Sequence, residues 1–307
     1  MTPDQAMAWV RQRTDGIPVS ATRLHGGLMN HVHRVRLSSG KAWVVKRAPP
    51  HVAAAPEIPL AAERAELEAR ALRCVAGSQV PQLVDIHAHT LILEDIGDGP
   101  DLAGWLRTGG DPHILDRLAA WLRRLHDRPG PGFVNHDIQK TRLSVQYRPL
   151  GGWLDERGHP EARQAGRQAL AVGTHLATPG PDFVMGDLWP PSVQVRPQRP
   201  GGFVVLDWEM ATAGHRAQDL GHLCAHLWLE QLVIGQDHGW IRRFVDAYGP
   251  LPPRVARTAA QHQGCELLAR SIGGFARSDL QPGQIAPIID QAVHLLLRAD
   301  SPTEPAT

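Results

Sequence analysis

Two aspartates that each follow a short apolar run are the residues of this sequence best placed to do chemistry. Asp187 follows FVMG and Asp207 follows FVVL, with Pro190 and Pro191 between them. Because proline cannot donate to a β-ladder, the pattern predicts a loop and then a β-hairpin, with one carboxylate before the first strand and one after the second. One acid could accept a proton while the other holds a divalent cation, although a lone Gly-Asp is more often a turn.

Lys46 ends the apolar run AWVVK, where a purely structural role would rarely place a lysine. Its ammonium is a compact charge suited to phosphate oxygens. Upstream, Gly26 and Gly27 would let backbone amides approach a phosphate, or they could simply form a hairpin turn. The residue types alone leave both alternatives open.

Composition narrows the class of protein. The 307 residues are 42% hydrophobic and 21% charged, which is typical of a globular protein with a sizeable core, in two domains or one two-lobed unit. A net charge of +1 argues against a nucleic-acid-binding surface. Three widely spaced cysteines argue against a disulfide framework, and neither a signal peptide nor a membrane span is expected. We therefore expect a cytoplasmic protein.

The elements that must position these residues fall into two groups. In the first part of the chain the sequence pattern predicts mostly strands, together with an N-terminal helix and one acidic helix. The expected elements are a helix at 4–15, strands at 22–24, 32–37 and 43–46, the acidic helix at 60–75 and strands at 80–86 and 90–94. Turn residues at 95–100 mark a boundary. Beyond it we expect helices at 101–107, 112–128, 161–176, 218–229, 239–248, 253–272 and 287–297, interrupted by the Asp187–Asp207 hairpin.

In this order the parts match the kinase template for phosphoryl transfer. The chain resembles the aminoglycoside phosphotransferase and choline kinase group of small-molecule kinases over nearly its whole length. The resemblance rests on short motifs: Gly26 to Asn30, Val45-Lys46, Glu68 to Leu72, Leu93 to Gly97, Arg124 to His126, Gly186-Asp187, Asp207 to Glu209, Gly214 and Asp219-Leu220. It implies an α+β, two-lobed protein-kinase-like fold, with a β-rich N-lobe at 1–95, a helical C-lobe at 96–300 and a disordered tail at 301–307.

The resemblance also implies roles for individual residues. Asp187 would be the catalytic base toward a hydroxyl of a small polar acceptor, and Asp207 with Ser192 would hold Mg²⁺. Asp219 would brace the catalytic loop. The ATP-binding residues would be Gly26, Gly27, Asn30, Lys46, Glu68 and the hinge residues Glu94, Asp95 and Ile96.

The acceptor is less well defined. The segment after Lys46, the serine at position 192 and the segment from Cys265 to Leu280 are similar to 5-methylthioribose kinases, which points to Arg270 as a substrate residue and to a sugar acceptor. Trp189 could also line the acceptor pocket, although the tripeptide Trp189-Pro190-Pro191 is not found in those kinases. An antibiotic kinase of the aminoglycoside or macrolide type is the rival hypothesis. A nucleotide-binding pseudokinase is another, because Met185 replaces the histidine usual before Gly-Asp and Ser192 replaces the usual asparagine.

His222 and His226 stand four residues apart on a predicted helix, a spacing that metal-binding pairs use. We identify no downstream acid or cysteine pair that would complete such a site. Ordinary packing is therefore the favoured interpretation of these two histidines.

Overall fold

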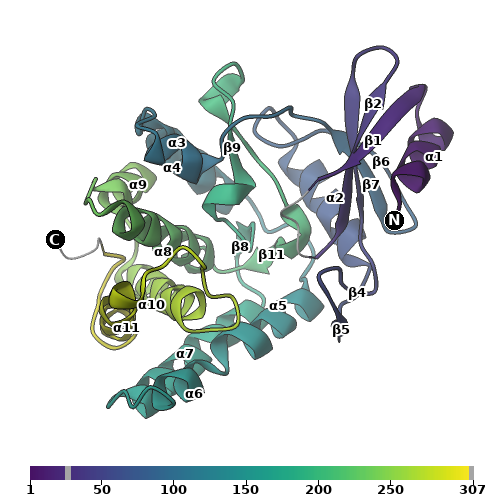
Figure 1. The fold of residues 1–307 in the computed structure, drawn as a ribbon. Helices are drawn as coiled ribbons and strands as arrows, with labels where there is room; N and C mark the ends of the chain where they lie inside the picture. The colour runs from purple at the N-terminus through teal and green to yellow at the C-terminus, as the bar shows by residue number, and fades with distance from the viewer. Residues whose placement is uncertain (25–28, 304–307) are drawn as a thin grey trace.

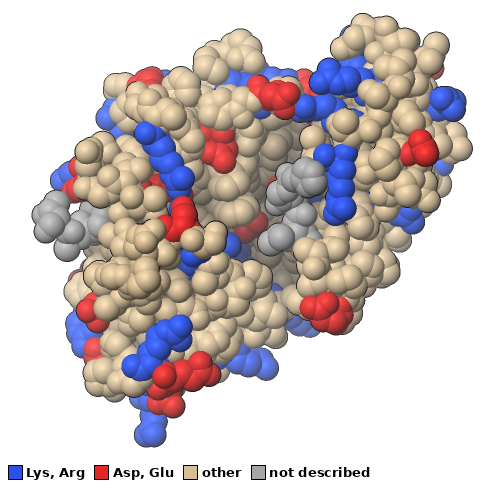
Figure 2. All heavy atoms as spheres, viewed as in Figure 1, with Lys and Arg blue, Asp and Glu red and all other residues tan. Residues whose placement is uncertain are grey.

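The computed structural model describes residues 1–24 and 29–303. A small antiparallel sheet with two helices forms one part of the molecule, and a larger helical part lies beside it (Figure 1). The α+β, two-lobed fold class is thereby confirmed. The space-filling view shows a hollow in the molecular surface between the sheet part and the helical part (Figure 2).

The sheet part follows the predicted order closely. It contains a five-stranded antiparallel sheet in the order β1-β2-β3-β7-β6 and a separate two-stranded hairpin of β4 and β5. Its elements are α1 (Pro3–Arg13), β1 (Pro18–Arg23), β2 (His31–Leu37), β3 (Ala42–Arg47), β4 (His51–Val52), β5 (Ala55–Pro59), α2 (Arg64–Val75), β6 (Leu83–His87) and β7 (Thr90–Glu94).

The two helices cover opposite faces of this sheet (Figure 1). Val45 of β3 is buried with Ala6 and Val10 of α1. Lys46, the next residue, faces the other side and α2, since alternate residues of a strand point to opposite faces. The strand period therefore aims the lysine at the acidic helix.

Two features of the sheet part differ from the prediction: an additional hairpin and the start of α2. The proline-rich stretch after β3 forms the β4–β5 hairpin, which has no alternating pattern to signal it. The helix expected from Leu60 begins only at Arg64, because residues 62–63 are in a turn.

The helical part holds most of the buried core. Its helices are α3 (Leu102–Arg107), α4 (His113–His126), α5 (His136–Arg142), a π-helix (Leu143–Tyr147), α6 (Leu150–Asp155), α7 (Ala162–Ala177), α8 (Ala217–Ile234), α9 (Trp240–Tyr248), α10 (Pro253–Ser271) and α11 (Pro282–Leu297). None of the helices in the described residues is long and apolar enough to cross a membrane.

The segment before α7 was not predicted to be helical, yet it forms α5, the π-helix and α6. Its apolar residues Leu143, Tyr147, Leu150 and Leu154 do recur at helical spacing, a signal that the sequence analysis did not use. α11 also begins earlier than predicted and contains Pro287. At the other end, Thr303 exchanges two backbone hydrogen bonds with the Gln263 side chain of α10, although it belongs to the segment predicted to be a disordered tail.

The predicted loop and hairpin are present between α7 and α8. β9 (Val193–Val195) pairs with β10 (Phe203–Val205), while β8 (Asp182–Val184) pairs with β11 (Thr212–Gly214). α8 passes beneath them and is buried on all sides from Ala217 to Gln231. A helix buried on all sides shows no apolar stripe, so sequence patterns give no indication of which way its polar residues point.

Candidate active site

Lys46 lies between two carboxylates from different parts of the fold. Its Nζ is 2.9 Å from the carboxylate of Glu68 on α2 and 2.9 Å from Oδ1 of Asp207, which follows β10. The lysine and Glu68 are buried, whereas the Asp207 side chain is half exposed. The predicted pairing of Lys46 with Glu68 is present, and Asp207 lies directly against them.

The charges around Lys46 keep it protonated. Burial disfavours the ammonium, but Asp207, Glu209 and Glu68 outweigh that effect and raise the pKa of Lys46 above its usual value. A permanently charged ammonium beside an accessible carboxylate is a suitable place for phosphate oxygens and a divalent cation.

Asp207 begins a 3₁₀ turn with its backbone in the left-handed region, at φ 60°. Its half-exposed carboxylate fits Mg²⁺, which keeps several waters and takes only one or two protein carboxylates together with substrate phosphates. Glu209, two residues later, is buried instead. It accepts a hydrogen bond from Asn30 at 2.6 Å and lies 3.5 Å from Nε of Arg64 on α2.

The loop that carries Asp187 is fixed through its backbone. Asp219, at the start of α8, accepts hydrogen bonds from the backbone nitrogens of Met185 and Gly186, both at 2.8 Å. Its carboxylate is also 3.1 Å from Nε2 of His126 on α4. The bracing role predicted for Asp219 is present in the structure, and it does not require a histidine at position 185.

Arg142 holds the same loop from the other side. Its guanidinium donates to the carbonyl of Gly186, which also accepts from Nε2 of Gln218 at 3.0 Å. Arg142 is buried at the end of α5. Sequence analysis missed it, because no helix was predicted there and the local sequence does not distinguish a buried arginine from an exposed one.

The two residues predicted to bind substrate come together beside Asp187. The Arg270 guanidinium lies over the ring of Trp189, 5.2 Å from its centroid, and 5.9 Å from that of Phe275. His226 of α8 packs against the same tryptophan ring at 5.4 Å. Trp189 and Arg270 therefore form one mixed aromatic and cationic surface, and Trp189 is two residues along the chain from Asp187.

His222 and His226 belong to this region, so ordinary packing is not an adequate description of them. Their rings stack at 5.1 Å, and Glu266 of α10 lies 3.3 and 3.2 Å from their Nε2 atoms. Nε2 of His222 is also 3.7 Å from Oδ1 of Asp187. The missing acid was thus present forty residues downstream, but a fully buried glutamate on α10 has no sequence signature that links it to α8.

Other predicted residues are engaged within the protein. The buried hydroxyl of Ser192 donates to the carbonyl of Trp189 at 2.8 Å, which closes the Trp-Pro-Pro-Ser turn, and its role as a metal ligand stays a prediction. Asn30 joins Glu209 to Arg64. Gly26 and Gly27 lie outside the described residues.

The hinge residues are held by three arginines. The carboxylates of Glu94 and Asp95 pair with Arg199 and Arg34 respectively. The carbonyl of Ile96 accepts from Nε of Arg196 at 3.0 Å. The predicted contacts of hinge backbone with adenine stay a prediction.

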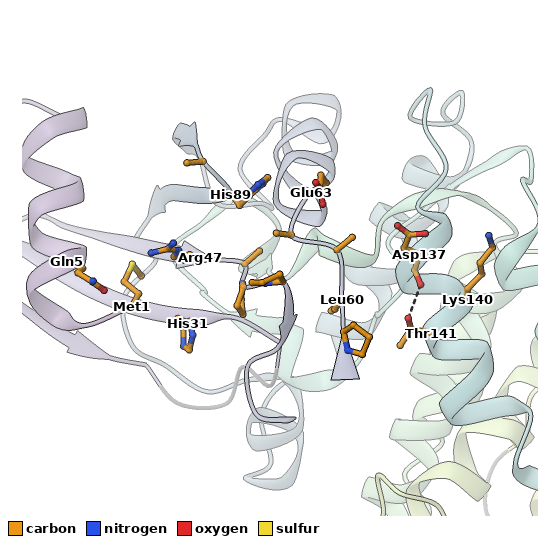
Figure 3. A pocket seen from close by; sticks show the side chains of 17 residues that line it. Met1, Gln5, His31, Arg47, Leu60, Glu63, His89, Asp137, Lys140 and Thr141 are labelled. Atoms are coloured by element: carbon orange, nitrogen blue, oxygen red, sulfur yellow. Dashed lines mark hydrogen bonds between the residues drawn. The ribbon is translucent and has the colours of Figure 1, made fainter. Parts of the chain in front are cut away.

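A cavity of about 890 Å³ opens elsewhere, between the sheet part and α5. Figure 3 shows Arg47, His31 and His89 on one side of it, and Asp137 and Lys140 of α5 on the other. None of the predicted catalytic side chains is among the described residues that line this cavity. Arg47 faces the cavity, whereas its neighbour Lys46 points to the other side of the strand, toward Glu68. The cavity is distinct from the candidate active site.

The two-lobed fold and the contacts of Lys46 with Glu68 and Asp207 are those expected for a small-molecule kinase. The model of the phosphotransferase enzyme family matches residues 20–257, and the chain belongs to this family. It is therefore a phosphotransferase that acts as a small-molecule kinase. No curated protein matches the sequence.

Solved structures share the fold at low sequence identity. A protein of Thermobifida fusca assigned as a fructosamine-3-kinase is 21% identical with a TM-score of 0.61, covering 97% of this chain and 100% of its own. A spectinomycin phosphotransferase in complex with ADP and spectinomycin is 12% identical with a TM-score of 0.58, covering 97% and 98%. The choline kinase of Streptococcus pneumoniae is 16% identical with a TM-score of 0.55, covering 91% and 93%.

Proposed function

We propose that this protein transfers the γ-phosphate of ATP to a hydroxyl group of a small, neutral, sugar-like metabolite. The observation that carries the proposal is the position of Lys46, buried between Glu68 and the half-exposed Asp207. The similar structures that were solved with ADP or AMP support the choice of a nucleotide as phosphate donor.

In this proposal Lys46 and Asp207 neutralise charge on the phosphates, and Asp187 accepts a proton. Lys46 binds phosphate oxygens, and Asp207 holds Mg²⁺, which supplies the neutralisation of charge on the β- and γ-phosphates when it is bound. Asp187 orients the acceptor hydroxyl and takes its proton as the oxygen–phosphorus bond forms. The braced backbone of Gly186 keeps this carboxylate in place.

The departures at Met185 and Ser192 are compatible with an active enzyme. Met185 is bound through its backbone nitrogen by Asp219, so the loop is braced without the usual histidine. A cation that keeps its waters can be held by Asp207 without the Ser192 hydroxyl. The contact of Asp219 with Met185 and the half-exposed carboxylate of Asp207 favour catalysis over a pseudokinase.

The charges beside Asp187 favour a neutral acceptor over a polycationic antibiotic. The two buried glutamates on this side of the site are already paired with arginines: Glu266 with Arg142 and Arg270, and Glu230 with Arg107 and Arg277. A polycationic acceptor would need carboxylates that are free to bind ammonium groups. The Trp189–Arg270 surface instead combines an aromatic side chain with guanidinium hydrogen-bond donors, a combination that suits a neutral sugar.

Turnover in a screen of sugars, amino alcohols and antibiotics, measured as ATP consumption, tests the proposal. The wild type should phosphorylate at least one sugar-like acceptor, and Asp187→Asn should lose that activity by a factor of about 100 or more while it still binds nucleotide. Nucleotide binding without turnover across the panel would instead identify a pseudokinase.

The choice of acceptor has a separate test. Arg270→Ala should raise KM for the sugar acceptor about 10-fold or more and leave the affinity for ATP nearly unchanged, because Arg270 lies on the acceptor side. Unchanged sugar kinetics, or phosphorylation of cationic antibiotics alone, would contradict the sugar hypothesis.

A further inference from the structure

The orientation of the His222 ring is set by Arg142. The Nη2 atom of Arg142 is hydrogen-bonded to Nδ1 of His222. A guanidinium only donates, so Nδ1 must accept and the ring proton of the neutral imidazole is on Nε2. The buried histidine thus has a defined tautomer, with its N–H bond on the side of Glu266 and Asp187.

This N–H donor is not satisfied. Nε2 of His222 makes no hydrogen bond within the part of the chain that the structure describes, although it is 3.3 Å from Glu266 and 3.7 Å from Asp187. The side chain is only 2% exposed. A buried donor without an acceptor costs about 1–3 kcal/mol, so its retention beside Asp187 calls for a functional explanation.

A metal ion does not provide that explanation. His222, His226 and Glu266 offer ligand atoms within 4.8 Å of one another. However, a metal-binding histidine donates its other ring N–H to an oxygen, and here Nδ1 of His222 faces a guanidinium. Arg142 and Arg270 also already neutralise Glu266, so a divalent cation would add charge to a cationic cluster.

Glu266 is not the missing partner either. The Glu266 oxygen nearest to Nε2 of His222 is Oε1, and its two acceptor positions are already taken by Nε of Arg270 at 2.6 Å and Nε2 of His226 at 3.2 Å. The other oxygen accepts from Gln146. The remaining acceptor within reach of the His222 N–H is Oδ1 of Asp187, whose side chain is 21% exposed and able to adjust.

We propose that His222 is a positioning residue that donates from Nε2 to Oδ1 of Asp187 when the acceptor is bound. The other carboxylate oxygen is then directed at the acceptor hydroxyl. Hydrogen bonds of this kind are often long without substrate and shorten in the reactive complex. Arg142 completes the arrangement, because one guanidinium fixes both the His222 tautomer and the Gly186 carbonyl next to Asp187.

The proton count is simple. The acceptor hydroxyl gives its proton to the free oxygen of Asp187 as its oxygen bonds to phosphorus, the bond to the leaving ADP breaks, and His222 keeps its own proton throughout. The inference rests on the proposed function, in which Asp187 is the base.

The kinetic test compares two substitutions. His222→Leu removes the donor and should lower kcat about 10- to 100-fold with KM for ATP unchanged, the loss expected for one hydrogen bond to a charged group. His222→Gln places an amide donor near Nε2 and should recover most of kcat. His294→Leu, at an exposed position of α11, is the matched control. Equal kcat for the Leu and Gln variants would overturn the proposal.

A spectroscopic test does not depend on turnover. Long-range ¹H–¹⁵N correlation spectra of ¹⁵N-histidine-labelled protein, with the His222 signals assigned by their loss in His222→Gln, should show a neutral ring protonated at Nε2. A ring protonated at Nδ1 would overturn the inference even if Asp187→Asn abolishes activity. Retained activity in Asp187→Asn would overturn the proposed function, while the measured tautomer would still report on the Arg142 contact.

Discussion

The contact of Asp219 with the catalytic loop gives the sharpest prediction of stability. In Asp219→Asn one oxygen becomes an NH₂ group, which faces the N–H of either Met185 or Gly186. One charge-assisted hydrogen bond is lost, its donor is left buried, and the remaining bonds become weaker neutral ones. Together these losses amount to about 3 kcal/mol of the free energy of unfolding.

A loss of that size should lower Tm by about 5 °C, since the entropy of unfolding is about 2.1 cal/mol/K per residue and the chain has 307 residues. Differential scanning calorimetry and urea denaturation measure it, with Asp137→Asn as the control, because Asp137 is an exposed acid on α5 whose amide variant should melt like the wild type. We also expect kcat to fall more than the affinity for ATP, since the loop carries Asp187. A Tm for Asp219→Asn within about 2 °C of the wild type would refute the bracing argument.

Two further predictions concern backbone geometry and pH. Gly186→Ala should lower the free energy of unfolding by more than about 2 kcal/mol in urea denaturation, because φ at Gly186 is +86° and a Cβ would lie 2.2 Å from the Met210 carbonyl. Gly152→Ala, at an open helical position, should raise the free energy of unfolding by about 0.5–1 kcal/mol. Equal effects of the two substitutions would contradict this account. Burial lowers the pKa of His226 from 6.5 to about 3. Arg270 lowers it further, while the hydrogen bond to Glu266 acts in the opposite direction. Between those two pH values the unfolded chain binds a proton at His226 that the folded chain does not bind. The free energy of unfolding should therefore fall on acidification below about pH 6.5, by up to about 1.4 kcal/mol per pH unit. His226→Gln should flatten the curve of unfolding free energy against pH.

Local patterns predicted most of the sheet part, apart from the β4–β5 hairpin and the start of α2. Strand alternation accounts for Lys46 and Val45 facing opposite sides, whereas the choice of Glu68 among the glutamates of α2 came from the family resemblance. The same local signals located the hairpin that carries Asp207 and the loop that carries Asp187. These residues are adjacent to turns or strand ends, where a glycine, a proline or a change of period marks the position.

The acceptor side could not be predicted in the same way. His222 and Glu266 are separated by forty-four residues and meet only because α8 and α10 pack along their length. Both helices are buried on most of their surface, so no amphipathic stripe indicates which way a polar side chain points. Arg142 ends α5, a mostly polar helix of seven residues, which is too short to show a helical pattern by itself.

Three buried arginines explain how irregular loops can hold catalytic groups rigidly. Arg64 donates to the carbonyls of Met29, Pro49 and Ala61, Arg142 to that of Gly186, and Arg196 to those of Ile96, Gly97 and Val195. Loop carbonyls lack ladder partners, and leaving them buried without a donor would cost about 1–3 kcal/mol each. A guanidinium presents five donors in a fixed plane, so one side chain can satisfy several carbonyls and fix their relative positions, which a lysine cannot do. The backbone at Met29, the loop that carries Asp187 and the segment after β7 are therefore each held by at least one buried arginine. Lys46, which supplies a single compact charge, is one of only three lysines in the chain.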